Sequence, residues 1–126
     1  MSYDAQFETH ENHIRIHVTG SRRYGDAAVE AGEVGRRIVE YCRKADIYRV
    51  LVVLDLSGRL TAIDSLDIVT QSRDYGWDFN FKLAFVDLNE ESAEDVRFTE
   101  TVAVNRSYTV KAFTDENEGL EWLLDN

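Results

Sequence analysis

The sequence predicts an α/β domain in which helices flank a mixed, mostly parallel sheet, in the order ββαβαβαβα. Three observations support this prediction. Residues 13–18 alternate apolar and polar side chains, as in a strand with one buried face. Residues 48–56 form a nearly continuous aliphatic run, as in a strand covered on both faces. Helical segments separate the later strands, and this alternation is typical of parallel strands joined by right-handed crossovers.

The first two strands are expected to form an antiparallel hairpin over residues 5–10 and 13–18. The two residues between them suit a tight turn, because Asn12 tolerates a positive φ. The apolar side chains of the second strand share one face: Ile14, Ile16 and Val18.

Ala27–Ala45 is expected to be a helix, because its apolar side chains recur at spacings of three and four residues. Gly32 and Gly35 inside this helix each cost about 1 kcal/mol relative to alanine. We expect close packing of the helix on the sheet to offset that cost. Cys42 lies on the apolar stripe, where a buried structural thiol is expected rather than a nucleophile.

The aliphatic run at 48–56 is expected to be the central strand of a four- or five-stranded sheet. A second helix is expected over 64–75, with Thr61 or Asp64 as its N-cap. The later elements, in chain order, are a strand over 81–86, a helix over 92–105, a strand over 108–113 and a helix over 115–124.

The whole chain, residues 1–126, is expected to be a single domain, since it lacks proline and any linker-like stretch. The formal net charge of −10 argues against nucleic acid or an anionic membrane surface as a partner. The longest apolar run, 50–54, is too short to span a membrane, so stable membrane insertion is not expected. A single cysteine and the lack of a signal-peptide pattern favour the cytoplasm.

Residues 50–66, VLVVLDLSGRLTAIDSL, resemble the STAS domain of anti-sigma factor antagonists. That family carries Asp-Leu-Ser after a buried strand and then an Asp-Ser pair that opens a helix. Here Asp55 begins the first motif, and Asp64 and Ser65 form the second. The spacing between the motifs is slightly longer than in the family, and larger residues, beginning with Leu66, replace the small residues after the pair. The resemblance implies a protein-interaction switch in which a partner kinase phosphorylates Ser65.

The second half of the chain resembles a related group, the SpoIIAA-like proteins of bacteria. The similarity lies in residues 82–87 (KLAFVD), 98–106 (FTETVAVNR) and 110–122 (VKAFTDENEGLEW). The similarity extends over most of the chain as a shared order of helices and strands. It implies the STAS-like fold and no established chemistry. An apolar or lipid ligand is implied only by analogy with lipid-carrier domains of similar topology.

Ser65 has two interpretations. Phosphorylation would suit a helix N-terminus, where backbone N–H groups and the helix dipole favour a phosphate. Alternatively, Asp64 and Ser65 only cap the helix. Because negative charge is tolerated near a helix N-terminus, aspartate at position 65 is expected to leave the fold intact.

The second predicted helix and the segment after it carry more apolar surface than one contact with a sheet requires. Ile63, Leu66 and Val69 are expected to share the inward stripe, while Ile68 points about 100° away from Val69. Such excess surface indicates a ligand cleft, although ordinary core or homodimer contact is the alternative. Trp77 is expected beside a pocket bounded by this helix or at a dimer interface. The candidate ligand-binding residues are Leu66, Ile68, Val69, Tyr75, Trp77 and Phe79.

No catalytic residues are predicted, because the sequence has no Gly-rich phosphate loop, nucleophile elbow or credible pair of carboxylates. We therefore expect a non-enzymatic protein with no cofactor. Asp55 is the one acid considered for a site, since it ends a central strand at the carboxyl edge. His10 and His13 are expected to face each other with His17 too distant to join them, so no metal site is expected. The basic side chains interpreted as a solvated face are Arg22, Arg23, Arg36 and Arg37.

Overall fold

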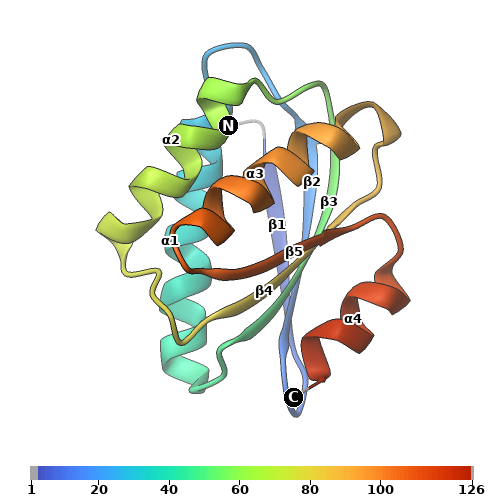
Figure 1. Cartoon of the computed structure of the whole chain (residues 1–126). Helices are drawn as coiled ribbons and strands as arrows, with labels where there is room; N and C mark the ends of the chain where they lie inside the picture. The colour runs from blue at the N-terminus through green and yellow to red at the C-terminus, as the bar shows by residue number, and fades with distance from the viewer. Residues whose placement is uncertain (1–2, 126) are drawn as a thin grey trace.

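Five strands form one sheet whose spatial order, β1-β2-β3-β4-β5, is the same as their order in the chain (Figure 1). The structure, a computed structural model, describes residues 3–125. β1 pairs with β2 in antiparallel fashion, and every later pair of neighbours is parallel. This confirms the predicted mixed sheet with the aliphatic run in its central strand. The strands are β1 (Tyr3–Thr9), β2 (Ile14–Ser21), β3 (Arg49–Ser57), β4 (Lys82–Asp87) and β5 (Thr109–Phe113).

Helices cover both faces of the sheet. Three of them connect successive parallel strands and lie on the same face, because right-handed crossovers that always step in one direction place their helices together. The last helix packs on the opposite face, beside β3 and β4 (Figure 1). This arrangement confirms the predicted order of elements. The helices are α1 (Ala27–Ala45), α2 (Ala62–Ser72), α3 (Ala93–Asn105) and α4 (Glu116–Leu124), with 3₁₀ turns η1 (Arg73–Tyr75) and η2 (Glu90–Ser92).

The central strand β3 is buried on both faces, as its composition predicts. Val50 and Val52 belong to the larger core under α1, α2 and α3, which we call the inner face. Leu51 and Val53 point the other way and pack with Leu123 of α4, on what we call the outer face. Two cores on one sheet therefore depend on alternate residues of the same strand.

The two glycines of α1 face α2 and η1, so the expectation that they pack on the sheet is wrong. A Cβ atom on Gly32 would lie 2.7 Å from Oε1 of Gln71. A Cβ atom on Gly35 would overlap the hydroxyl and ring of Tyr75. Gln71 in turn donates a hydrogen bond to the Ala28 carbonyl at 2.6 Å. The glycines are needed because these side chains approach the α1 backbone closely.

Replacing Gly35 with alanine is expected to destabilise the protein by about 1–3 kcal/mol, because the new methyl group overpacks the contact with Tyr75. Helix propensity alone would give the opposite sign, a gain of about 1 kcal/mol. Urea denaturation of Gly35→Ala, Tyr75→Ala and the double variant measures the coupling. In the double variant, we expect Gly35→Ala to lower the free energy of unfolding much less, because Tyr75→Ala removes the ring that the new methyl group would meet. A Gly35→Ala protein more stable than the wild type would contradict the assigned contact.

Candidate functional site

An apolar cavity of about 140 Å³ lies between α2 and the inner face of the sheet. α2 contacts chiefly α1 and α3, so it forms a roof that rests on two neighbouring helices. The helix begins at Ala62, where Thr61 is the N-cap: its hydroxyl accepts the Asp64 N–H at 3.1 Å, and the Asp64 carboxylate accepts the Thr61 N–H at 3.2 Å. Of the two caps considered from the sequence, Thr61 is therefore the one used.

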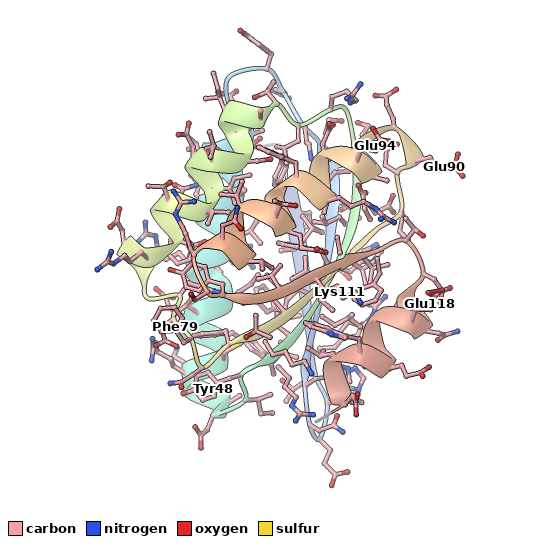
Figure 2. The ribbon with its side chains drawn as sticks, in the orientation of Figure 1. Tyr48, Phe79, Glu90, Glu94, Lys111 and Glu118 are labelled. Atoms are coloured by element: carbon pink, nitrogen blue, oxygen red, sulfur yellow. The ribbon has the colours of Figure 1, made fainter. Side chains whose placement is uncertain are left out.

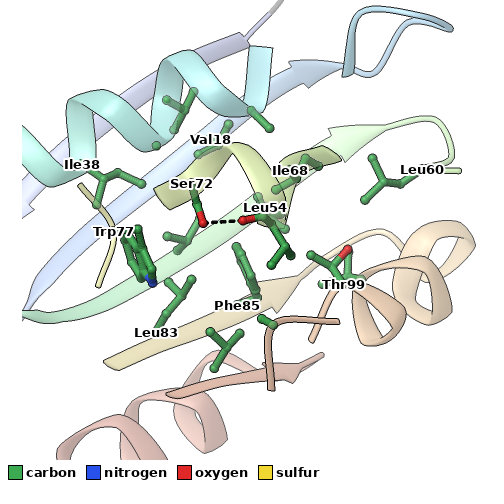
Figure 3. Close-up of a pocket in the computed structure, with 18 of the residues that line it drawn as sticks. Val18, Ile38, Leu54, Leu60, Ile68, Ser72, Trp77, Leu83, Phe85 and Thr99 are labelled. Carbon is green, nitrogen blue, oxygen red and sulfur yellow. Dashed lines mark hydrogen bonds between the residues drawn. The ribbon is translucent and has the colours of Figure 1, made fainter. Parts of the chain in front are cut away.

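The walls of the cavity are almost entirely apolar (Figure 3). Trp77 lies at one end and Leu60 with Thr99 at the other, while Leu54 and Phe85 of the sheet lie between them. Leu54 and Phe85 are only half-buried although they belong to inner strands of the sheet, because the space above them is unfilled. Further lining side chains come from α1, namely Ala31, Val34 and Ile38, and from α3, namely Val96 and Ala103.

The hydroxyl groups of Ser72 and Thr99, in the walls formed by α2 and α3, are already hydrogen-bonded within the protein. Ser72 donates to the Val69 carbonyl at 2.6 Å, which Figure 3 marks with a dashed line. The Thr99 hydroxyl shares a 2.8 Å hydrogen bond with Ser65 and donates to the Asp95 carbonyl at 3.2 Å. A molecule in the middle of the cavity would therefore be held mainly by apolar contact.

The cavity volume limits what can occupy it. An engineered apolar cavity of about 150 Å³ stays dry and binds benzene. The cavity described here, at about 140 Å³, is therefore large enough for one small ring and too apolar to favour water. A full-length lipid acyl chain is several times larger than benzene and does not fit in this conformation.

Four of the six candidate ligand-binding residues line the cavity: Ile68, Val69, Tyr75 and Trp77. The other two do not. Leu66 is 41% exposed and Phe79 is 69% exposed. Phe79 lies at the outer edge of the molecule, as Figure 2 shows, and its ring lies 5.6 Å from that of Tyr108.

The predicted inward stripe of α2 is wrong for two of its three members, since Ile63 is 71% exposed and Leu66 also faces solvent. The buried residues of the helix are Ser65, Val69 and Ser72. Their spacing follows one face, but two of the three are polar. Because α2 packs between two other helices, small side chains fit its contacts better than large apolar ones. Hydrophobicity alone therefore identified the wrong face.

Ser65 is fully buried, with an exposed fraction of 0%. Its hydroxyl contacts Thr99 across the interface between α2 and α3. The helix begins three residues before Ser65, so this residue lies inside the first turns and not at an exposed start. Phosphorylation at position 65 stays a prediction, and a kinase would reach the hydroxyl only after α2 moves away from α3.

Trp77 and Tyr75 form the wall at one end of the cavity. Trp77 is buried and stacks on Phe81, with ring centroids 4.3 Å apart. Desolvation raises the pKa of Tyr75 to about 12, although the Arg36 guanidinium nearby acts in the opposite direction. Tyr75 is therefore neutral at physiological pH and presents an uncharged ring to the cavity.

The remaining sequence candidates lie away from the cavity. Asp55 is on the outer face, where its carboxylate lies 3.6 Å from Nε2 of His17. His10 and His13 do face each other, with stacked rings whose centroids are 4.5 Å apart. No group of three metal-ligating side chains occurs in the part of the chain that the structure describes. Cys42 is buried, and desolvation raises the pKa of its thiol to about 12, so it is uncharged at neutral pH.

Sequence reasoning missed the sheet side and the far end of the cavity. Val52, Leu54 and Leu56 alternate along β3 and could have been assigned to the helix-covered face from that period alone. Arg22, interpreted from the sequence as part of a solvated face, lies in the cavity wall and is only half-exposed. Nothing in the local sequence around Arg22 distinguishes it from its exposed neighbour Arg23.

No protein-family model and no curated protein matches this chain. Two solved structures share its fold. An anti-sigma factor antagonist from Mycobacterium paratuberculosis has a TM-score of 0.60 and 10% identity, over 98% of this chain and 96% of that one. A DUF3478-family protein with a SpoIIAA-like fold from Shewanella loihica PV-4 has a TM-score of 0.54 and 18% identity, over 97% and 94%. The chain therefore has the SpoIIAA-like fold that its sequence predicts. Within residues 3–125, no helix is long and apolar enough to cross a membrane.

Proposed function

We propose that this protein is a non-enzymatic binding module that holds a small apolar ligand in the cavity under α2. The observation that carries this proposal is the size of the cavity. Natural cores contain few voids larger than a water molecule. At about 24 cal/mol per Å³, a closed and empty cavity of 140 Å³ would cost about 3 kcal/mol of stability. That is a large fraction of the about 5–15 kcal/mol by which domains are stable, so a bound ligand would offset a substantial cost.

Binding of a protein partner is a second candidate function, because α2 also exposes apolar side chains. Ile63 and Leu66 lie in its first two turns and are exposed to solvent. An anti-sigma factor antagonist has the same fold, and that similarity supports a protein-interaction role. The burial of Ser65 does not favour its phosphorylation as the switch. A homodimer stays a prediction.

Ala31→Leu tests the binding proposal, because it fills the cavity from α1. The wild-type melting temperature is expected to rise with toluene, since a ligand that binds only the folded state stabilises it. Ala31→Leu should melt higher than the wild type without toluene and should respond weakly to it. Ala103→Leu is a second variant that fills the cavity, in this case from α3. Differential scanning calorimetry measures both effects.

Ala28→Leu is the matched control, since Ala28 lies on the same helix outside the cavity wall. Its response to toluene should equal that of the wild type. A second readout uses Trp122→Phe, in which Trp77 is the remaining tryptophan and its emission should change as toluene binds. An equal response of all variants to toluene, or none in the wild type, would contradict binding in this cavity.

A further inference from the structure

We infer that the ligand of this cavity is a small apolar carboxylic acid whose carboxylate binds Arg22. This inference rests on the proposed function and adds the chemical class of the ligand. Arg22 contributes the charged side chain to an otherwise apolar wall. A ligand complementary to such a wall has an apolar body and one anionic group at its end.

The position of Arg22 is fixed by the backbone. It follows β2 directly, and its N–H donates to the Ser57 carbonyl at 2.9 Å. Its guanidinium donates from Nη1 to the Gly58 carbonyl at 3.0 Å. These two contacts hold the side chain at the carboxyl edge of the parallel strands, which is the usual ligand-binding edge of α/β sheets.

The charge of Arg22 is not neutralised by an ion pair with any residue between 3 and 125. Other arginines are paired: Arg15 with Glu116 at 2.7 Å, and Arg59 with Asp95 at 2.8 Å. The Asp95 carboxylate of α3, on which the Arg22 charge also acts, accepts the Leu60 N–H at 3.0 Å. Arg59 and Leu60 therefore already satisfy Asp95, and Arg22 remains available to a ligand anion.

Tyr3 also lines the cavity, and its side chain is hydrogen-bonded to that of Arg22. Burial raises the pKa of Tyr3 to about 12, while the Arg22 charge acts in the opposite direction. The phenol is therefore protonated at neutral pH and can donate a hydrogen bond. Glu30 and Asp64 also act on Tyr3, so both positive and negative charges lie near this residue.

A monocarboxylate matches this end better than other anions. The guanidinium fork fits the two oxygens of a carboxylate, and such charge-assisted bonds are about twice as strong as neutral ones. A doubly charged phosphate would leave one charge uncompensated beside apolar walls and nearby acids. The volume then restricts the body of the acid to about one ring or a short branched chain.

The test compares 3-phenylpropanoate with 3-phenylpropanamide, which has nearly the same shape and no charge. Isothermal titration calorimetry of the full chain should show that the acid binds about tenfold more tightly, or better, at low ionic strength. Arg22→Gln should reduce the affinity for the acid to that for the amide. Arg22→Lys should restore part of the preference, because it keeps the charge.

Arg23→Gln is the matched control: it removes the same charge from the exposed neighbouring residue and should keep the preference for the acid. The comparison of acid and amide in the wild type needs no variant, so it stands even if Arg22→Gln does not fold. If the wild type bound acid and amide equally well and still bound toluene, only the proposed role of Arg22 would be overturned. If toluene, acid and amide all failed to bind, the proposed function itself would be overturned.

Discussion

Replacing Ser65 with aspartate is expected to destabilise the protein by about 3 kcal/mol or more, because it places a carboxylate in a fully buried contact between α2 and α3. The sequence alone predicts tolerance at this position, since it places residue 65 at a helix start. Ser65→Ala should cost only about 0.5–1.5 kcal/mol, because Thr99 keeps its hydrogen bond to the Asp95 carbonyl.

Ile63→Asp is the control for this prediction. Ile63 lies in the same first turn and is 71% exposed, so the added charge should change stability by less than about 0.5 kcal/mol. Chemical denaturation at two pH values separates charge from shape. Burial raises the pKa of the new carboxyl above its unfolded value, so its penalty grows as pH rises through the acidic range. Similar losses for Ser65→Asp and Ile63→Asp at neutral pH would show that Ser65 is accessible.

Truncating Leu123 to alanine is expected to cost about 2–5 kcal/mol, because it opens a void in the outer-face core. Leu123 is fully buried against β3 and β4, and α4 is the helix that covers this face. Lys82 holds the end of α4 by donating to the Trp122 and Asp125 carbonyls at 2.8 and 2.7 Å. These contacts should keep α4 in place, so that the loss comes from the cavity created.

Leu88→Ala provides the comparison, since Leu88 is 50% exposed and its truncation should change stability by about 0.5 kcal/mol or less. Urea denaturation measures both variants. Below its melting temperature, Leu123→Ala should still bind toluene, because the cavity is on the opposite face of the sheet. Equal losses for Leu123→Ala and Leu88→Ala would contradict the outer-face core.

The order and type of the elements could be predicted because strong periodic signals dominate them. α1 begins and ends at the residues predicted from its apolar spacing. The boundaries of the strands differ by up to three residues, since a period of two does not define where pairing ends. The predicted second helix ends earlier than expected, because the chain tightens into η1 after Ser72.

The cavity could be predicted only in part, because its shape depends on how α2 sits on other helices. The excess of apolar residues at 68–77 is visible in the sequence, and Ile68 and Trp77 do lie in the cavity wall. Which face of α2 is buried depends on close approach to α3, and there serine fits better than leucine. The same limit applies to Arg22, whose neighbours in space come from distant parts of the chain.

The strands of the sheet have the same order in space as in the chain, and this has a consequence for folding during synthesis. Each strand that leaves the ribosome finds its partner already present, beginning with the β1–β2 hairpin. Assembly can therefore proceed from the N-terminus by adding one crossover unit at a time, without waiting for a distant segment. Two parts of the structure are completed only late in synthesis. They are α3, which forms one wall of the cavity, and α4, which covers the outer face. Until α4 is made, the apolar side chains of Leu51 and Val53 on the outer face stay uncovered.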